Sequence, residues 1–151
     1  MAALVLTLAS AAPSAAQTGS ACRLTVLEMV FGDYDVFDKQ RTRSVARVAV
    51  DCSGPESKVR PRIELSTGSS QTFTSRTQRS GANVLTYNIY ADQALTQIVG
   101  DGSSGTTALF PALSPIAGGA AGTVDLYGAI DARQFAPPGA YFDTVYVTLI
   151  F

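Results

Sequence analysis

Residues 140–151 read AYFDTVYVTLIF, and apolar side chains recur at every second position up to the last residue. Val145, Val147, Leu149 and Phe151 would share one face of an extended chain, with Tyr and Thr at most of the positions between them. A repeat of two residues is typical of a β-strand that buries one face. This stretch therefore predicts a strand, the longest candidate in the chain.

The same alternation recurs upstream. In residues 44–52, Ala46, Val48, Val50 and Cys52 fall on one face, and charged residues fall on the other. Sequences rich in Gly, Pro, Ser and Asp separate the candidate strands and suit turns, and no amphipathic helix pattern is present. Short strands between frequent turns predict a β-sandwich or barrel. The remaining candidate strands span residues 24–31, 59–66, 84–91 and 123–130.

Composition restricts the class of protein further. A chain of 151 residues without an internal linker or repeat predicts one domain. Charged residues make up 15% of it, and there are 13 glycines, a balance that indicates a secreted all-β protein. The net charge of −1 comes without a basic cluster, so the sequence predicts no nucleic-acid binding.

The N-terminal residues predict export. Residues 1–16 contain an apolar stretch followed by Pro13 and small residues that suit cleavage before Gln17, as in a signal peptide. The first basic residue is Arg23, so the usual positive start is missing, and the true start lies upstream or the sequence is trimmed. An apolar N-terminal strand is the alternative. The mature domain is expected over residues 22–151.

Cys22 and Cys52 are the only cysteines. In an exported chain, an even pair favours a disulfide over a metal site or a reactive thiol, with two buried free thiols as the alternative. A bridge predicts Cα atoms within about 7 Å of each other. Closing a loop of this length would add roughly 3.6 kcal/mol through the unfolded state.

Few residues point to chemistry. The chain has no histidine, which removes the commonest general base and the most frequent zinc ligand. The glycine-rich run 100–105 lacks the Lys of a phosphate-binding loop and is interpreted as a turn. Asp33, Asp35 and Asp38 fit a solvated turn, with a weak calcium site of unusual form as the alternative. We therefore expect no enzyme activity, catalytic residue, metal or cofactor.

Aromatic residues leave a second kind of ligand open. They could form a face on which sugars stack, since Tyr combines apolar area with a polar hydroxyl. Packing in the core and between strands explains them equally well. The residues concerned are Tyr87, Tyr90, Tyr127, Tyr141 and Phe142.

Several short motifs, taken in order, resemble the spore coat protein U domain family. The resemblance covers residues 22–151, and each motif is weak alone, but the shared order is specific. The motifs are Cys22-Arg-Leu-Thr, Val30-Phe-Gly-Asp-Tyr-Asp35, Val48-Ala-Val-Asp-Cys52, Leu85-Thr-Tyr-Asn-Ile-Tyr-Ala-Asp92, Gly100-Asp-Gly102, Leu126-Tyr-Gly-Ala-Ile130 and Pro138-Gly-Ala-Tyr-Phe-Asp-Thr-Val145.

The resemblance implies an immunoglobulin-like β-sandwich that lacks its last strand, as in subunits of archaic chaperone–usher pili. It implies three partners: a periplasmic pilus chaperone, an outer-membrane usher and neighbouring pilin subunits, whose strands fill the open groove. Cys22 and Cys52 match the family's disulfide positions. The C-terminal strand, with Val145, Val147, Leu149 and Phe151, would border the groove.

One feature departs from the family. Residues 17–21 are too few and too polar to act as a donor strand, which predicts a tip or terminating subunit, or a copy whose upstream residues are missing. The expected function is a secreted structural or adhesive fimbrial subunit that serves surface attachment and biofilm formation. A free secreted β-sandwich that binds carbohydrate is the alternative, and it predicts a stable monomer without a chaperone. A secreted enzyme would need a site that works without histidine.

Overall fold

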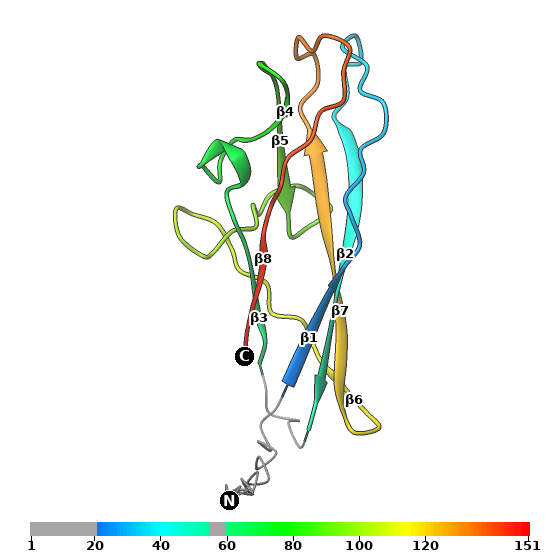
Figure 1. The fold of residues 1–151 in the computed structure, drawn as a ribbon, viewed down its shortest axis with the longest axis vertical. Helices are drawn as coiled ribbons and strands as arrows, with labels where there is room; N and C mark the ends of the chain where they lie inside the picture. Colours follow the sequence, from blue (N-terminus) through cyan, green and yellow to red (C-terminus); the bar gives the residue numbers. More distant parts are fainter. Residues whose placement is uncertain (1–20, 55–59) are drawn as a thin grey trace, which may run out of the picture.

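The computed structural model describes residues 21–54 and 60–151, which form two β-sheets (Figure 1). The predicted signal peptide, residues 1–16, lies outside the described residues. One sheet has the strand order β1-β2-β7-β5-β4, with β6 beside β7, and the other pairs β3 with β8. The strands are β1 (Ala21–Val26), β2 (Thr42–Ser53), β3 (Arg62–Leu65), β4 (Arg76–Ser80), β5 (Asn83–Tyr90), β6 (Ser114–Ile116), β7 (Gly119–Ile130) and β8 (Val147–Ile150), and a 3₁₀ turn spans Gly68–Ser70.

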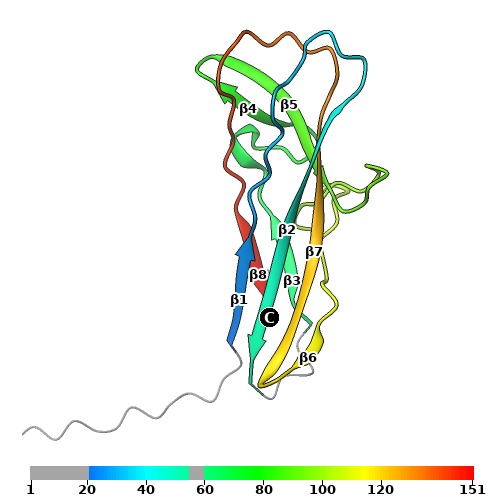
Figure 2. The ribbon, with the colours of Figure 1, turned by 90° about the vertical axis from the view of Figure 1, so that its right-hand side faces the viewer.

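Strands β2 and β7 form the backbone of the larger sheet. They pair along their whole length, from Thr42 opposite Ile130 to Ser53 opposite Gly119. Their inward side chains meet the inner face of the smaller sheet, where Ile63 is fully buried. Both views show an elongated sandwich of two layers (Figures 1 and 2). The predicted all-β, immunoglobulin-like sandwich is confirmed.

The expected disulfide is also confirmed. Cys22 of β1 lies opposite Cys52 of β2, and the two are bonded with their Cα atoms 4.0 Å apart. Such a short separation is typical of a cross-strand pair that exchanges no backbone hydrogen bonds. The bridge therefore fastens β1 to the edge of the larger sheet through a second, covalent contact.

Three predicted strands are shorter than expected, and the one expected over residues 59–66 contains regular strand only at Arg62–Leu65. The strand expected over residues 24–31 ends at Val26, and the one expected over 140–151 contains regular strand only at Val147–Ile150. The C-terminal stretch is divided because Phe142 pairs with Arg79 on β4 before the chain reaches β3. The last part of the chain thus crosses from one sheet to the other.

An arginine is completely buried between the sheets. Arg76 donates to the Asn88 side chain at 2.7 Å and to the carbonyl oxygens of Ser66 and Val99, each at 2.8 Å. Its guanidinium also lies 5.5 Å from the ring centre of Phe73. Burial lowers the pKa of Arg76, but arginine keeps its charge in proteins. These contacts tie β4, β5 and two loops into one unit.

We expect the disulfide to contribute a large share of the free energy of unfolding. Replacing both Cys22 and Cys52 by Ala should lower the free energy of unfolding by about 3 to 4 kcal/mol, because the unfolded chain regains the entropy of an open loop. Urea unfolding of the two proteins measures this difference. A reducing agent should lower the urea midpoint of the wild type to that of the variant and leave the variant unchanged. A decrease in the free energy of unfolding below about 1 kcal/mol would contradict the estimate.

Candidate groove between the two sheets

Strands β1 and β8 are the two edges that define the candidate site. Among the described strands, β1 pairs only with β2 and β8 pairs only with β3. In Figure 1, β8 stands apart from β1, with no strand drawn between them. Each strand therefore has one edge that lacks a neighbour.

The direction of the backbone groups in β1 follows from one hydrogen bond. The amide of Leu27 donates to the carbonyl of Arg47 at 2.9 Å, so Leu27 faces β2. Backbone groups alternate between the two sides of an antiparallel strand. Leu24 and Val26 therefore direct their amides and carbonyls away from β2, toward the free edge.

The same reasoning applies to β8. The Ser66 amide donates to the Tyr146 carbonyl at 3.0 Å, so Tyr146 faces β3. By alternation, Val145, Val147 and Leu149 direct their backbone groups away from β3. Their side chains are half-buried and pack against the core. Both free edges thus combine unpaired backbone groups with apolar side chains that point inward.

A groove with a volume of about 1290 Å³ opens between these edges and reaches the core. One wall is the segment 26–36, which follows β1, and the other is the segment 136–147, which leads into β8. Its floor consists of buried core residues from both sheets, so an occupant of the cavity would pack directly against the core. The floor residues are Ala46, Leu65, Leu85, Tyr87, Ile89, Leu126 and Ile130.

The predicted groove residues separate into two groups. Val145 and Val147 line the cavity. Leu149 packs against the core but does not line it, and Phe151 lies at the surface, 57% exposed. The alternation is therefore interrupted before the final residue, because β8 ends at Ile150. That these residues receive a partner strand stays a prediction.

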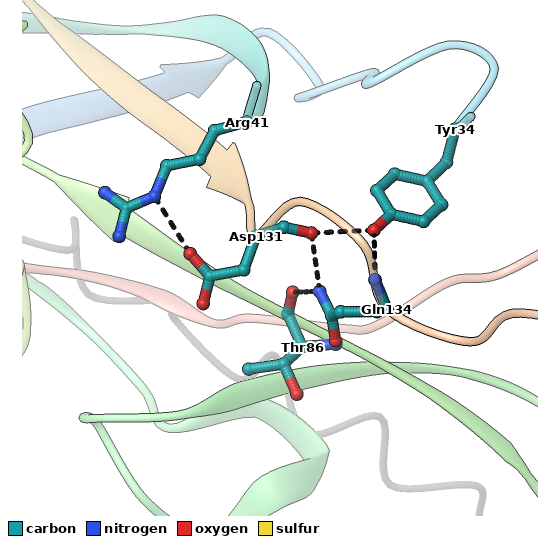
Figure 3. Close-up of polar contacts among 5 residues, drawn as sticks. All are labelled: Tyr34, Arg41, Thr86, Asp131 and Gln134. Atoms are coloured by element: carbon teal, nitrogen blue, oxygen red, sulfur yellow. Dashed lines mark hydrogen bonds and ion pairs between the residues drawn. The ribbon is translucent and has the colours of Figure 1, made fainter. Parts of the chain in front are cut away.

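A network of hydrogen bonds joins the wall that follows β1 to the loop after β7 and to β5 (Figure 3). The hydroxyl of Tyr34 donates to the carbonyl of Asp131 and accepts from the amide of Gln134, both at 2.8 Å. The Gln134 side chain pairs with the backbone of Thr86 through two bonds of 2.7 Å. Arg41 pairs with the Asp131 carboxylate at 2.9 Å. The network therefore fixes Tyr34 of this wall beside the end of β7.

A close glycine contact positions the wall that follows β1. A Cβ atom at Gly128 of β7 would lie 2.2 Å from Met29 Sδ and 2.7 Å from Phe31 Cζ. Phe31 in turn packs edge-on against Tyr87, with ring centres 5.9 Å apart. Gly128 is thus required for Met29 and Phe31 to rest on the sheet. Phe31 and Gly128 belong to two separate motifs of the family resemblance, and the fold brings these motifs into contact.

Tyr87 and Asp143, which both line the groove, form a partly buried contact. The Tyr87 hydroxyl donates to Asp143 Oδ2 at 2.8 Å, and the amides of Ser69 and Thr144 donate to Oδ1 at 2.9 Å. Burial, followed by the contact with Asp143, raises the pKa of Tyr87. Asp143 therefore anchors the wall that leads into β8 to the floor of the groove.

The other candidate residues do not assemble into a site. Asp35 and Asp38 accept hydrogen bonds from the amides of Phe37 and Gln40, as in a turn. No group of three acidic or cysteine side chains within residues 21–54 and 60–151 is arranged to hold a metal ion. In the same part of the chain, no helix has the length and apolar character to cross a membrane.

The five aromatic residues do not share one face. Tyr87 is buried in the groove floor, whereas Phe142 lies on the wall that leads into β8 and is largely exposed. Tyr90 and Tyr127 are cross-strand partners on β5 and β7. Tyr141 donates its hydroxyl to the carbonyl of Pro137 within the second wall. The fold therefore places these five rings at separate positions, and they do not form one stacking face.

Comparison with known proteins identifies the family. The sequence pattern of the Spore Coat Protein U domain matches residues 7–148, and the chain belongs to that family. No curated protein matches the chain.

Among solved structures, a chain of the CsuC–CsuE complex is similar in fold. That complex joins a chaperone to a tip adhesion subunit before assembly and comes from the archaic chaperone–usher Csu pili of Acinetobacter baumannii. The similarity has a TM-score of 0.64 at 19% identity over 87% of this chain. The chain spans 40% of the length of that neighbour.

The Tyr87 contact predicts a specific dependence on pH. Because the folded state raises the pKa of Tyr87, the stability from this contact is complete below the unfolded pKa of about 10 and is lost as the pH rises further. Urea unfolding from about pH 8 to about pH 11 should show a steeper decline for wild type than for Tyr87→Phe. Parallel curves would show that the contact contributes nothing to the decline.

Proposed function

We propose that this chain is an exported subunit of a chaperone–usher fimbria and that its groove accepts a β-strand from a partner. The observation that carries the proposal is the pair of free edges, β1 and β8, on either side of an open core. A single inserted strand would pair with both edges at once. It would also cover the floor of the groove with its inward side chains.

The physical gain from such an insertion has two parts. Each backbone hydrogen bond formed at the edges contributes about 1 kcal/mol net, and each large apolar side chain that becomes buried contributes about 1.5 to 3 kcal/mol. Because side chains alternate along a strand, a shift by one residue would turn the apolar set outward. The groove therefore selects both the composition and the register of its partner.

The partners in this proposal follow from the family and the neighbouring structure. A periplasmic chaperone would fill the groove first, an outer-membrane usher would export the subunit, and a strand of a neighbouring pilin would then replace the chaperone. The assembled fibre would serve surface attachment and biofilm formation. The similarity to a chain of a chaperone–subunit complex supports this order.

The open core also distinguishes the proposal from a free carbohydrate-binding sandwich. A monomer that works alone gains nothing from two unpaired edges, which favour association with other chains. The candidate aromatic residues lie on several faces and do not form one stacking platform. A structural, strand-accepting role is thus better supported than sugar binding or catalysis.

The groove wall offers a matched pair of substitutions. Val147→Asp should abolish co-purification with the host's pilus chaperone, because the charge would enter an apolar interface at a half-buried position. Thr148→Asp is the control, since its side chain points outward from the same strand. Co-expression in a periplasm, followed by affinity capture of the chaperone, measures both variants.

The outcomes separate a binding defect from a folding defect. Formation of the Cys22–Cys52 bridge and the far-ultraviolet circular dichroism spectrum report whether Val147→Asp still folds. Capture of folded Val147→Asp at the wild-type level would show that the groove is not the chaperone site. Equal loss in both variants would point to the strand as a whole and not to its inward face.

A further inference from the structure

The rim of the groove carries charge of one sign. Among the described residues that line the groove, Glu28, Asp33, Asp35 and Asp143 are acidic, and none is a lysine or arginine. Glu28, Asp33 and Asp35 are exposed on the wall that follows β1. An occupant of the groove therefore lies beside carboxylates and meets no positive side chain from the lining.

These acids differ in how far their hydrogen-bonding capacity is used. Asp143 accepts three bonds, from Tyr87, Ser69 and Thr144. Asp35 accepts one, from the amide of Phe37 at 2.8 Å. Glu28 and Asp33 accept none from the rest of the described chain. The wall that follows β1 thus retains acceptors for a partner, whereas Asp143 is occupied within the fold.

The alternation of a strand determines which of its side chains meet these acids. Inward side chains of an inserted strand would enter the apolar floor, and outward ones would lie level with the exposed rim. The lining also contains Val30, which is 70% exposed. A Lys or Arg at an outward position can lay its aliphatic stem on such a residue and place its charge beside a carboxylate.

We propose that the partner strand which fills this groove alternates apolar inward residues with basic outward residues. The inference rests on the proposed function and specifies the partner of the same groove. The acidic wall of Glu28, Asp33 and Asp35 would select this partner by charge, and the floor would select it by apolar fit.

Binding of designed peptides to the mature chain tests the inference. Three labelled peptides of about nine residues, the length that spans several pockets, share Val and Ile at alternate positions. The positions between these apolar residues are all Lys in the first peptide, all Gln in the second and all Glu in the third. Fluorescence anisotropy measures the affinity of each peptide. The Lys peptide should bind about tenfold more tightly than the Gln peptide at about 20 mM salt, and the ratio should approach one at about 0.5 M.

A matched pair of variants locates the effect. The triple variant Glu28→Gln, Asp33→Asn and Asp35→Asn should bind the Gln peptide like wild type and lose the preference for Lys. Its control, Asp38→Asn, Asp51→Asn and Asp101→Asn, removes three acids outside the groove lining and should keep the preference. Unchanged affinity for the Gln peptide shows that each variant is folded.

Several results would overturn the inference. Equal binding of the Lys and Gln peptides, a preference that survives the triple variant, or tightest binding of the Glu peptide would each contradict selection by the acidic wall. Failure of all three designed peptides to bind would contradict strand acceptance itself, and with it this inference. Binding of the Gln peptide without a preference for Lys would leave the proposed function intact.

Discussion

The unpaired backbone edges of β1 and β8 constrain most other features of this chain. Peptide groups at such edges either stay hydrated or pair with another strand, because burying them without a partner costs roughly 1 to 3 kcal/mol each. Between these edges, the groove reaches down to core residues such as Leu126 and Ile130, which are themselves buried. The fold is therefore stable alone only to the extent that other contacts offset an incomplete core.

Three such contacts surround the groove. The Cys22–Cys52 bridge holds β1 on the larger sheet, although β1 has a neighbour on one side only. Arg76 joins two loops and two strands through buried hydrogen bonds. Tyr34 and Gln134 fasten the wall that follows β1 to the loop after β7. These contacts link segments of the fold that lie far apart in the sequence.

The sequence predicted those features that depend on local alternation. The inward faces of β2 and β8 and the sandwich class follow from residues two apart, whereas the disulfide was expected from the single pair of cysteines in an exported chain. The polar strand β4, with the sequence Arg-Thr-Gln-Arg-Ser, carries no such alternation and was missed. The contact between Gln134 and Tyr34 was missed as well, because it joins residues 100 positions apart.

The position of the groove was predicted only in part, for a related reason. The resemblance indicated the C-terminal strand as one border, and Val145 and Val147 line the cavity. The opposite wall depends on how Met29 and Phe31 rest on Gly128, a contact across the sheet that periodicity does not reveal. The acidic character of that wall becomes visible only once the lining residues are known.

Residue-resolved amide exchange tests the central claim most directly. It is measured by nuclear magnetic resonance on the mature chain alone and with its groove filled by the chaperone. The account predicts that binding slows exchange at Leu24, Val26, Val147 and Leu149, whose amides face the two free edges, while Leu27, already bonded to Arg47, changes little. Protection elsewhere, with these four amides unchanged, would contradict the account.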